Sequence, residues 1–451
     1  MVLLEQREIK YLFSNSDLKK LILPLVVEQF LLLTVGLVDS IMIASVGEAA
    51  VSAVSLVDNI VVFVTQIFVA LGTGGAVVAG QYLGQKNDKK SCEAADQLLL
   101  FVIVSSVVVM IVGYMLRGFI LHKVFGELEA DVMQNANTYL LIVFSSIPFL
   151  GIYNGVAALF RAMGNSKITM KISILMNAFN VLGNAICIYG LKMGIAGAAI
   201  PTTLSRVLAA VISVYLIRNS ELQIHISKKI CTRFNKDLIK KILYIGIPNS
   251  LENGMFQFGK LIVLNLVASF GTVSIAANAV GNAIGVLQVI PGMAIMQANL
   301  AVVSQCVGAN DEYQVKYYTK KMTMIAYISI IVTSVMILLG TGKILEIYNL
   351  SRETAALAKE VITFTCIMGM ITWPFAFLLP STLRASNDVK FCMYVSVSSM
   401  WIFRVGSSYV LGRYMGMGLM GVWTAMVIDW IVRGIFFGWR YFSGRWKLYW
   451  N

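Results

Sequence analysis

The sequence has little charge and little histidine for its length. Only 13% of the 451 residues are Asp, Glu, Lys or Arg, which is about half the share in a soluble domain. Two histidines and six scattered cysteines, with no CxxC pair, argue against zinc sites, histidine-dependent catalysis and a disulfide framework. Because 58% of the residues are hydrophobic, a soluble fold would lack the polar residues needed to coat its core. These shortages exclude a soluble enzyme, a nucleic-acid-binding protein and a disordered scaffold.

The sequence consists mainly of long apolar runs. Each run is long enough for an α-helix to cross a bilayer, and too long for the alternating strands of a membrane barrel. The twelve runs lie near residues 20–44, 52–82, 93–116, 132–160, 169–190, 194–217, 242–270, 275–306, 321–342, 356–383, 391–411 and 418–438. They predict an all-α polytopic membrane protein with twelve transmembrane helices.

Basic residues are unevenly distributed between the segments that join these runs. With both termini placed in the cytoplasm, 26 of the 36 Lys and Arg residues fall on the cytoplasmic side, seven on the outer side and three within runs, at Arg206, Lys260 and Arg404. The positive-inside rule therefore predicts a multi-pass protein of the cell (cytoplasmic, or inner) membrane with both termini in the cytoplasm. The net charge of +13 then reflects topology and contact with the lipid bilayer, and we expect no nucleic-acid partner.

The two halves of the sequence match when one is shifted by about 224 residues. Matched positions include Pro24 and Pro248, Glu28 and Glu252, Gly47 and Gly271, and the Gln-x-x-Gly segments at 81–84 and 305–308. A near-constant offset over such a length indicates a duplication. Since each half holds six spans, both halves enter the membrane from the same side. They should form two six-helix lobes related by a pseudo-two-fold axis along the membrane normal.

This repeat sets the predicted domain organisation. We expect a cytoplasmic N-terminal arm (1–17), an N-lobe (18–218), a cytoplasmic linker (219–239), a C-lobe (240–442) and a cytoplasmic tail (443–451). Two lobes joined by a linker can rock, so that a cleft between them opens to either side in turn. The sequence contains no nucleotide-binding or nucleophile motif. We therefore expect a transporter driven by an ion gradient, with no enzymatic activity and no cofactor beyond the coupling ion, Na⁺ or H⁺.

The few ionisable residues within spans are the candidate functional groups, because placing a charge in the bilayer is costly. Asp39 in the first span is the strongest candidate for the coupling-cation site, either for H⁺ or for Na⁺, since its carboxylate can be neutralised by a proton or a metal ion. The alternative is a buried structural pair, for example with Arg206. For Asp58, Asp429 and Lys260 we favour a structural or interfacial role.

Glu28 and Glu252 occupy matching positions in the two repeats. They could contact a cationic substrate in the cavity, or each could simply hold its lobe together. A bound organic cation would favour aromatic faces beside a carboxylate. The predicted substrate cavity therefore comprises Glu28, Glu252, Gln257, Phe256, Tyr153 and Trp373.

The fifth span carries Asn177, Asn180 and Asn184, whose spacings of three and four place them on one helical face. Amide oxygens can ligate Na⁺, and amide groups can hydrogen-bond a carboxylate. In the sixth span, Pro201 frees a backbone carbonyl, and Thr202 beside it could face a cavity. We assign Asn180, Asn184 and Thr202 to the cation-coupling site. The alternative is hydrogen bonding between helices, a common use of Asn in membranes.

Several ordered motifs resemble those of the multidrug and toxic compound extrusion (MATE) family. They are Pro24 with Val38-Asp39-Ser40-Ile41-Met42, the paired segments Gln81-x-x-Gly84 and Gln305-x-x-Gly308, Phe160-Arg161-Ala162-Met163-Gly164-Asn165, Met176-Asn177-x-x-Asn180 and the Gly-x-x-Gly-Ala-Ala stretch that begins at Gly194. The resemblance extends over both lobes, residues 18–440.

The resemblance implies two six-helix lobes around a V-shaped cavity, and export of cationic amphipathic drugs and toxic compounds in exchange for Na⁺ or H⁺. It implies that Asp39 is the first-span cation residue and that Asn180 and Thr202 are polar cavity positions. Asn184 stands where many bacterial members have Asp. In the second lobe, acids found in some members fall at Phe256 and Trp373, so the resemblance favours a cation site in the first lobe.

Two other functions fit the same sequence class. A lipid-linked oligosaccharide flippase would need a strongly cationic cavity, whereas only three cations lie within the predicted spans. An intramembrane enzyme would need a catalytic arrangement that the sequence lacks. We therefore expect a monomeric antiporter whose partners are small organic cations and the lipid bilayer.

Overall fold

The computed structural model describes residues 11–126, 128–227 and 233–450. Every regular element among these residues is helical, as expected for a chain that must satisfy its backbone hydrogen bonds within a bilayer. Most of the predicted N-terminal arm and the middle of the predicted linker lie outside the described residues.

The N-lobe follows the predicted runs closely. Its elements are α1 (Asn15–Ala44), α2 (Glu48–Gly84), α3 (Asp88–Met115), α4 (Arg117–Phe119), η1 (Ile120–Val124), α5 (Ala130–Phe144), α6 (Ile147–Ala162), α7 (Ser166–Asn184), η2 (Ala185–Gly190) and α8 (Ala196–Ile217). The fourth predicted run is a bent pair, α5 and α6, with an angle of 48° between them. The fifth run is α7 continued by the π-helical segment η2.

The C-lobe repeats this plan. Its elements are α9 (Lys236–Ala268), α10 (Thr272–Gly308), α11 (Glu312–Ile347), α12 (Arg352–Ala385), α13 (Val389–Ser398), η3 (Ser399–Gly406), η4 (Ser408–Tyr414), α14 (Gly418–Phe442) and η5 (Arg445–Tyr449). Within the described residues, nine single helices are long and apolar enough to cross a membrane, and the α5–α6 pair makes a tenth. The remaining two predicted spans are α9, which carries polar residues such as Glu252 and Lys260, and the α13–η3–η4 segment.

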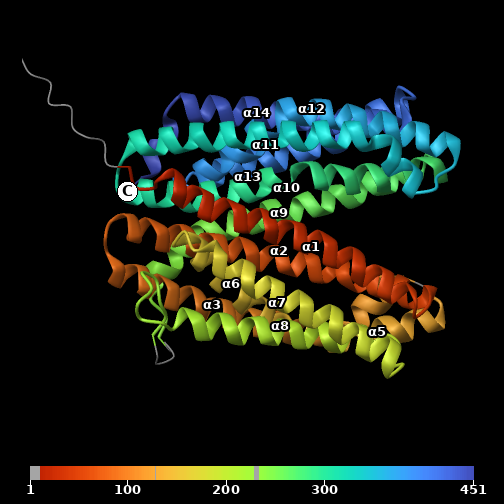
Figure 1. The fold of residues 1–451 in the computed structure, drawn as a ribbon, viewed down its shortest axis with the longest axis horizontal. Coiled ribbons are helices and arrows are strands. Elements are labelled where there is room, and N and C mark those ends of the chain that lie inside the picture. Colours follow the sequence, from red (N-terminus) through yellow and green to blue (C-terminus); the bar gives the residue numbers. More distant parts are fainter. Residues whose placement is uncertain (1–10, 127, 228–232, 451) are drawn as a thin grey trace, which may run out of the picture.

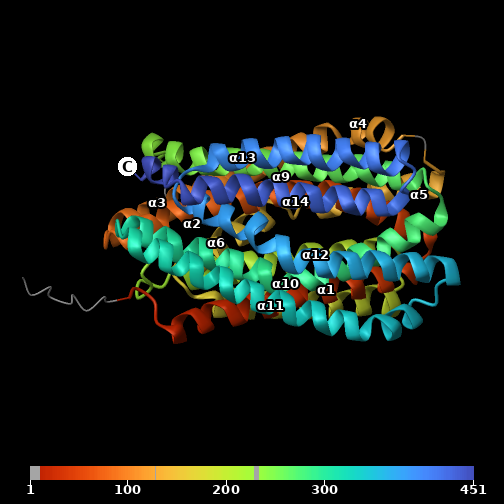
Figure 2. The same ribbon diagram turned by 90° about the horizontal axis from the view of Figure 1, so that it is seen from above.

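The two lobes form two layers of helices that run along the long axis of the molecule. Figure 1 shows the N-lobe as the lower layer and the C-lobe as the upper layer, with the first and last described segments of the chain at the same end of the bundle. We call this the terminal end and the opposite one the distal end. In the perpendicular view, α9, α13 and α14 run along one edge and α10, α11 and α1 along the other (Figure 2). This arrangement confirms the predicted two-lobe fold class.

The first helix of each lobe packs against the other lobe near its N-terminal end. Leu18, Leu21 and Leu25 of α1 are buried in the C-lobe core with residues of α10 and α12. In the same way, Leu238 and Ile242 of α9 are buried in the N-lobe core. Each lobe is therefore anchored to the other by a reciprocal exchange of helix ends, which agrees with the predicted pseudo-two-fold symmetry.

Glycines allow α2 and α10 to touch at the terminal end. A Cβ atom on Gly84 would lie 2.8 Å from the carbonyl carbon of Gln305, and one on Gly308 would lie 2.6 Å from the carbonyl carbon of Gln81. Both distances are too short for any side chain. The lobes are therefore closed against each other at this end, along a contact that only glycine permits at both positions.

Hydrogen bonds between the lobes reinforce this contact in the same symmetric way. Gln81 Nε2 donates to the carbonyl oxygen of Ala385 at 2.9 Å, and Gln305 Nε2 donates to that of Ala162 at 2.6 Å. The two Gln-x-x-Gly segments that reveal the repeat in the sequence thus form one closed contact between the lobes.

The lobes separate toward the distal end. A Cβ on Gly254 of α9 would lie 3.2 Å from the ring of Phe63 in α2, so the helices still touch at this depth. The same face of α9 continues with Phe258 and Leu261, whose exposed fractions are 57% and 50%. On α2, Asn59, one turn beyond Phe63, is also exposed. The facing surfaces of α9 and α2 are therefore uncovered toward the distal end, where the lobes are open.

Candidate functional site

The structure brings the four predicted cation-coupling residues together in the N-lobe. Asn184 Nδ2 donates to Asp39 Oδ1 at 3.0 Å. With its amide nitrogen turned toward Asp39, Asn180 donates to Oδ1 at 2.9 Å and to Oδ2 at 3.1 Å, while its own oxygen accepts from the Thr202 hydroxyl at 3.0 Å. The carboxylate of α1 is thus held by two neutral amides of α7, one of which is in turn bonded to Thr202 of α8.

Burial and helix geometry keep this cluster in place. Asn180 is 5% exposed and Asn184 is 1% exposed, and Asn184 ends α7 immediately before the π-helical segment η2. The oxygen Oδ1 of Asn184 is buried and has no hydrogen-bond partner in the described part of the chain. Asn177, on the same face, instead donates to Ser173 Oγ at 3.3 Å, so it serves the packing of its own helix. An orphaned amide oxygen beside a carboxylate is a ready ligand for a cation.

A second acid and a cation lie deeper in the same lobe. Tyr139 donates its hydroxyl to Asp58 Oδ1 at 3.2 Å, and Arg206 Nη1 donates to Ser146 Oγ at 2.8 Å. Among the described residues no ion pair joins Arg206 to Asp39. The alternative in which Asp39 is simply one half of a buried ion pair with Arg206 is therefore not what the structure shows.

The matched glutamates form equivalent buried ion pairs. Glu28 lies 3.6 Å from Arg161 and accepts from Thr169 Oγ1 at 2.9 Å. Glu252 accepts from Arg384 Nη2 at 2.7 Å. Each pair joins the first helix of a lobe to the end of its fourth span. For both glutamates, the structure thus favours the reading in which the acid holds its own lobe together.

The other predicted cavity residues fall in two places. Tyr153 is 9% exposed and Trp373 is 4% exposed, and both are packed in the hydrophobic cores of their lobes. Their contribution to a cavity wall stays a prediction. Phe256 and Gln257 on α9 are half-buried, next to the exposed Phe258 on the same helix. A cavity of about 840 Å³ at the terminal end, lined by Tyr82 and other residues, contains none of the predicted site residues.

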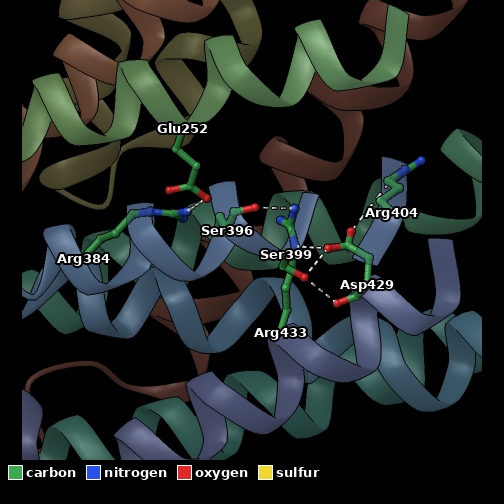
Figure 3. Close-up of polar contacts among 7 residues, drawn as sticks. All are labelled: Glu252, Arg384, Ser396, Ser399, Arg404, Asp429 and Arg433. Carbon is green, nitrogen blue, oxygen red and sulfur yellow. Dashed lines mark hydrogen bonds and ion pairs between the residues drawn. The ribbon is translucent and has the colours of Figure 1, made fainter. Parts of the chain in front are cut away.

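The C-lobe interior holds an ionic network that the sequence did not reveal. Arg433 Nε donates to Asp429 Oδ1 at 2.8 Å, and its Nη2 donates to the Ser396 carbonyl at 3.1 Å. Ser399 donates to the same Asp429 oxygen at 2.5 Å, while Arg404 stays 4.0 Å from the other one. Figure 3 shows Arg433 between Ser396 and Asp429, with the Glu252–Arg384 pair as a separate contact.

Arg433 corrects the predicted distribution of charge. The sequence count assigned it to the cytoplasmic tail, but it lies within α14, and its side chain is only 4% exposed. Its place one helical turn after Asp429 is the signal that could have revealed it, because acid and base at this spacing face each other on a helix.

The sequence was then compared with known proteins. It matches the MatE family over residues 24–186 and again over residues 248–410. This chain belongs to the MatE (MATE) family. The two matched ranges are offset by 224 residues, which confirms the duplication that the sequence predicted. MATE proteins are transporters, so the prediction that this protein is not an enzyme is also confirmed.

Several MATE relatives match nearly the whole chain. A protein named "Uncharacterized transporter YisQ" from Bacillus subtilis is 26% identical over 94% of this chain and 93% of its own length. A "Probable multidrug resistance protein NorM" from Thermotoga maritima is 24% identical over 96% of this chain and 93% of its own. Their similarity extends across both lobes and the linker.

Solved MATE structures share the fold. One, described as an outward-facing conformation of a multidrug resistance MATE family transporter of the MOP superfamily, has a TM-score of 0.88 at 18% identity and covers 96% of each chain. Another, from Pyrococcus furiosus, has a TM-score of 0.86 at 18% identity with the same coverage, and its binding pocket is described as having reverse polarity. At this identity the likeness shows the fold alone, which is that of a multi-pass membrane protein.

Proposed function

We propose that this MATE protein is an antiporter that exports amphipathic organic compounds, cationic drugs among them, in exchange for Na⁺ or H⁺. The observation that carries the proposal is the cluster around Asp39. It has one carboxylate, held by neutral amides, in a helix that crosses from one lobe to the other. Loading or unloading a cation there changes the contacts between α1 and α7, and through α1 the relation between the lobes.

The donor set suits a hard cation or a proton. The Asp39 carboxylate, the amide oxygens of Asn180 and Asn184 and the Thr202 hydroxyl are all oxygen ligands, which Na⁺ accepts. Without a cation, the amide nitrogens face the carboxylate. With one, rotation of each amide about its last bond presents oxygen instead. The partnerless Oδ1 of Asn184 supports this second state.

The transport cycle follows from the closed terminal end and the open distal end. The positive-inside rule supports a cytoplasmic terminal end, which makes this conformation outward-facing. In it, a cation from outside reaches Asp39 and the drug leaves from the cleft. Release of the Gly84–Gly308 contact would then open the terminal end, where the cation is discharged and a new substrate enters.

The test is ethidium efflux from vesicles under an imposed pH gradient or an imposed sodium gradient. We expect Asp39→Asn to be expressed at the normal level but to lose gradient-driven efflux, because a neutral amide cannot exchange a proton or balance a sodium ion. Activity under only one of the two gradients identifies the coupling ion.

Asp131→Asn is the matched control, since Asp131 is an exposed acid in the first turn of α5, away from the cluster. It should keep full efflux. Retained gradient-driven efflux in Asp39→Asn would remove Asp39 from the mechanism. Binding of undecaprenyl-linked sugars without ethidium efflux would favour the flippase alternative.

A further inference from the structure

The cavity of about 840 Å³ at the terminal end has walls from both lobes. Gln81 of α2 lines it on the N-lobe side, Asn387 in the turn after α12 lines it on the C-lobe side, and Trp450 in the tail also contributes. Gln81 Nε2 donates to Asn387 Oδ1 at 3.0 Å, so the two walls meet directly. The cavity therefore has this form only while the terminal end is closed.

Three lysines line this cavity, and two of them gather at one tyrosine ring. Lys241 Nζ donates to the Tyr82 hydroxyl at 3.0 Å and lies 5.4 Å from the centroid of its ring. Lys90 Nζ lies 5.8 Å from the same centroid, and Lys240 is the third lysine of the lining. All three are exposed, and an ammonium group has three donors, so each can also bind an anion in the cavity.

Two acids share the lining and limit the charge of the ligand. Glu93 of α3 and Asp237 in the first turn of α9 face three lysines, which leaves one positive charge. A phosphodiester, with its single negative charge, balances this excess, whereas a phosphomonoester would exceed it. The carboxylates can in turn accept hydrogen bonds from hydroxyl groups of the same ligand. The lining therefore fits a hydroxylated phosphodiester.

An exposed stripe on α9 favours a lipid over a soluble phosphodiester. It begins at Tyr244 in the cavity wall and continues with Ile247 and Leu251, whose exposed fractions are 37%, 49% and 53%. Lys390 of the neighbouring helix α13 lies 5.3 Å from the Tyr244 ring, and α9 and α13 run along one edge of the molecule (Figure 2). Lysine, tyrosine and aliphatic residues thus follow one another as headgroup, interface and acyl chains do in a bilayer.

We propose that this cavity binds the headgroup of an anionic, hydroxylated phospholipid, of which phosphatidylglycerol is the matching type, and that the bound lipid stabilises the closed terminal end. A ligand held between walls from both lobes loses contacts when the lobes part, so it favours the closed state. This inference goes beyond the proposed function, because it concerns a regulatory lipid and neither the exported substrate nor the coupling ion.

Two phospholipids with the same acyl chains test the binding. Phosphatidylglycerol carries a net negative charge, whereas phosphatidylethanolamine has the same phosphate and no net charge. Binding to the full-length protein in detergent is measured by native mass spectrometry. We expect one phosphatidylglycerol to bind about fivefold more tightly than phosphatidylethanolamine, which is the effect of about one charge at a membrane surface. Lys241→Gln should remove most of that preference, and so should Lys90→Gln.

Lys320→Gln is the matched control, because Lys320 is an exposed lysine of α11 that does not line the cavity. It should bind both lipids like the unmodified protein. The two test variants change exposed side chains on different helices, so one of them still tests the site if the other does not fold.

The effect on closure is measured by the distance between spin labels at residues 167 and 320, exposed lysine positions on α7 and α11. Adding phosphatidylglycerol should shift the distribution to shorter distances in the unmodified protein and much less in Lys241→Gln. An unchanged distribution at saturating lipid would overturn the proposed stabilisation of the closed state.

Equal affinities for the two lipids in the unmodified protein, or the same loss of preference in Lys320→Gln as in Lys241→Gln, would overturn the site. Tighter binding of phosphatidylethanolamine would overturn it in favour of a zwitterionic headgroup. Displacement of phosphatidylglycerol by millimolar inorganic phosphate would overturn the lipid as the source of the phosphate. None of these outcomes depends on gradient-driven efflux, so failure of the lipid site and failure of the antiporter are distinguishable.

Discussion

Replacing Gly84 by alanine should weaken the closed contact at the terminal end. The added Cβ would overlap the carbonyl oxygen of Gln305, and it would lie 2.8 Å from the carbonyl carbon of Gln305 and 3.0 Å from the backbone nitrogen of Ala309. Ordinary contacts of this kind are about 3.5–4.0 Å, so the two backbones must move apart by more than about 1 Å. Backbone atoms cannot rotate away as a side chain would. Relief of the clash therefore requires α2 and α10 to separate.

The size of the effect follows from overpacking, which costs about 1–3 kcal/mol in well-packed interiors. If the open state lacks this contact, the whole cost falls on the closed state. The ratio of closed to open molecules should then fall by about 5–150-fold. Gly308→Ala should act in the same way, because its Cβ would meet the Gln81 backbone at a symmetric position.

The assay is a distance measurement between spin labels at residues 89 and 320, two exposed lysine positions in the first turn of α3 and the third turn of α11. Gly84→Ala should shift the distribution to longer distances. Gly285→Ala is the control, since its Cβ, on the same helix as Gly308, would have no heavy atom within 4 Å. An unchanged distribution and unchanged efflux in Gly84→Ala would refute the argument that this contact closes the protein.

Two further predictions concern charged pairs. Arg384→Ala leaves the buried Glu252 carboxylate without its cation and should lower the free energy of unfolding by about 3–5 kcal/mol, which is measured as a lower melting temperature in detergent. Adding Glu252→Gln to this variant should restore part of the lost stability. A double variant with no recovery would contradict the pairing. Hydrogen bonds from Lys316 and Lys447 lower the pKa of Glu312, so its contribution to stability is complete above its ordinary pKa and is lost as the pH falls through the lowered value. Hydrogen exchange in η5 should therefore increase on acidification in the unmodified protein and much less in Glu312→Gln, and an equal increase in both would count against the ion pair.

Much of the N-lobe site could be predicted because local spacing determined it. Asn180 and Asn184 share a helical face, and a carboxylate in an apolar run must face protein or water. The structure adds what spacing could not show, namely that Asn177 on the same face bonds to Ser173 instead. Asn177 lies seven residues before Asn184 and therefore about 10 Å away along the helix axis, so the height at which Asp39 of α1 meets α7 decides which amides reach it. No local pattern encodes that height.

The C-lobe network was beyond sequence reasoning for a similar reason. Arg404 and Asp429 come from different helices, and Arg433 sits close enough to the end of a run to be counted with the cytoplasmic tail. The glutamates at matching repeat positions were visible, but their arginine partners lie more than a hundred residues away in the chain. Only packing brings these groups together, so the ionic network emerged with the tertiary structure.

The sequence by itself determined the helices and their approximate limits, because a chain in lipid must satisfy its backbone hydrogen bonds within each helix. It also determined the two-fold repeat, because a duplicated gene preserves the spacing of its motifs. The tertiary structure alone decided how the lobes meet. The crossing of α1 and α9 into the opposite lobes, the glycine contact of α2 with α10 and the opening at the distal end depend on contacts between surfaces far apart in the chain. The complementarity of those surfaces is a property of the folded molecule and not of any local pattern.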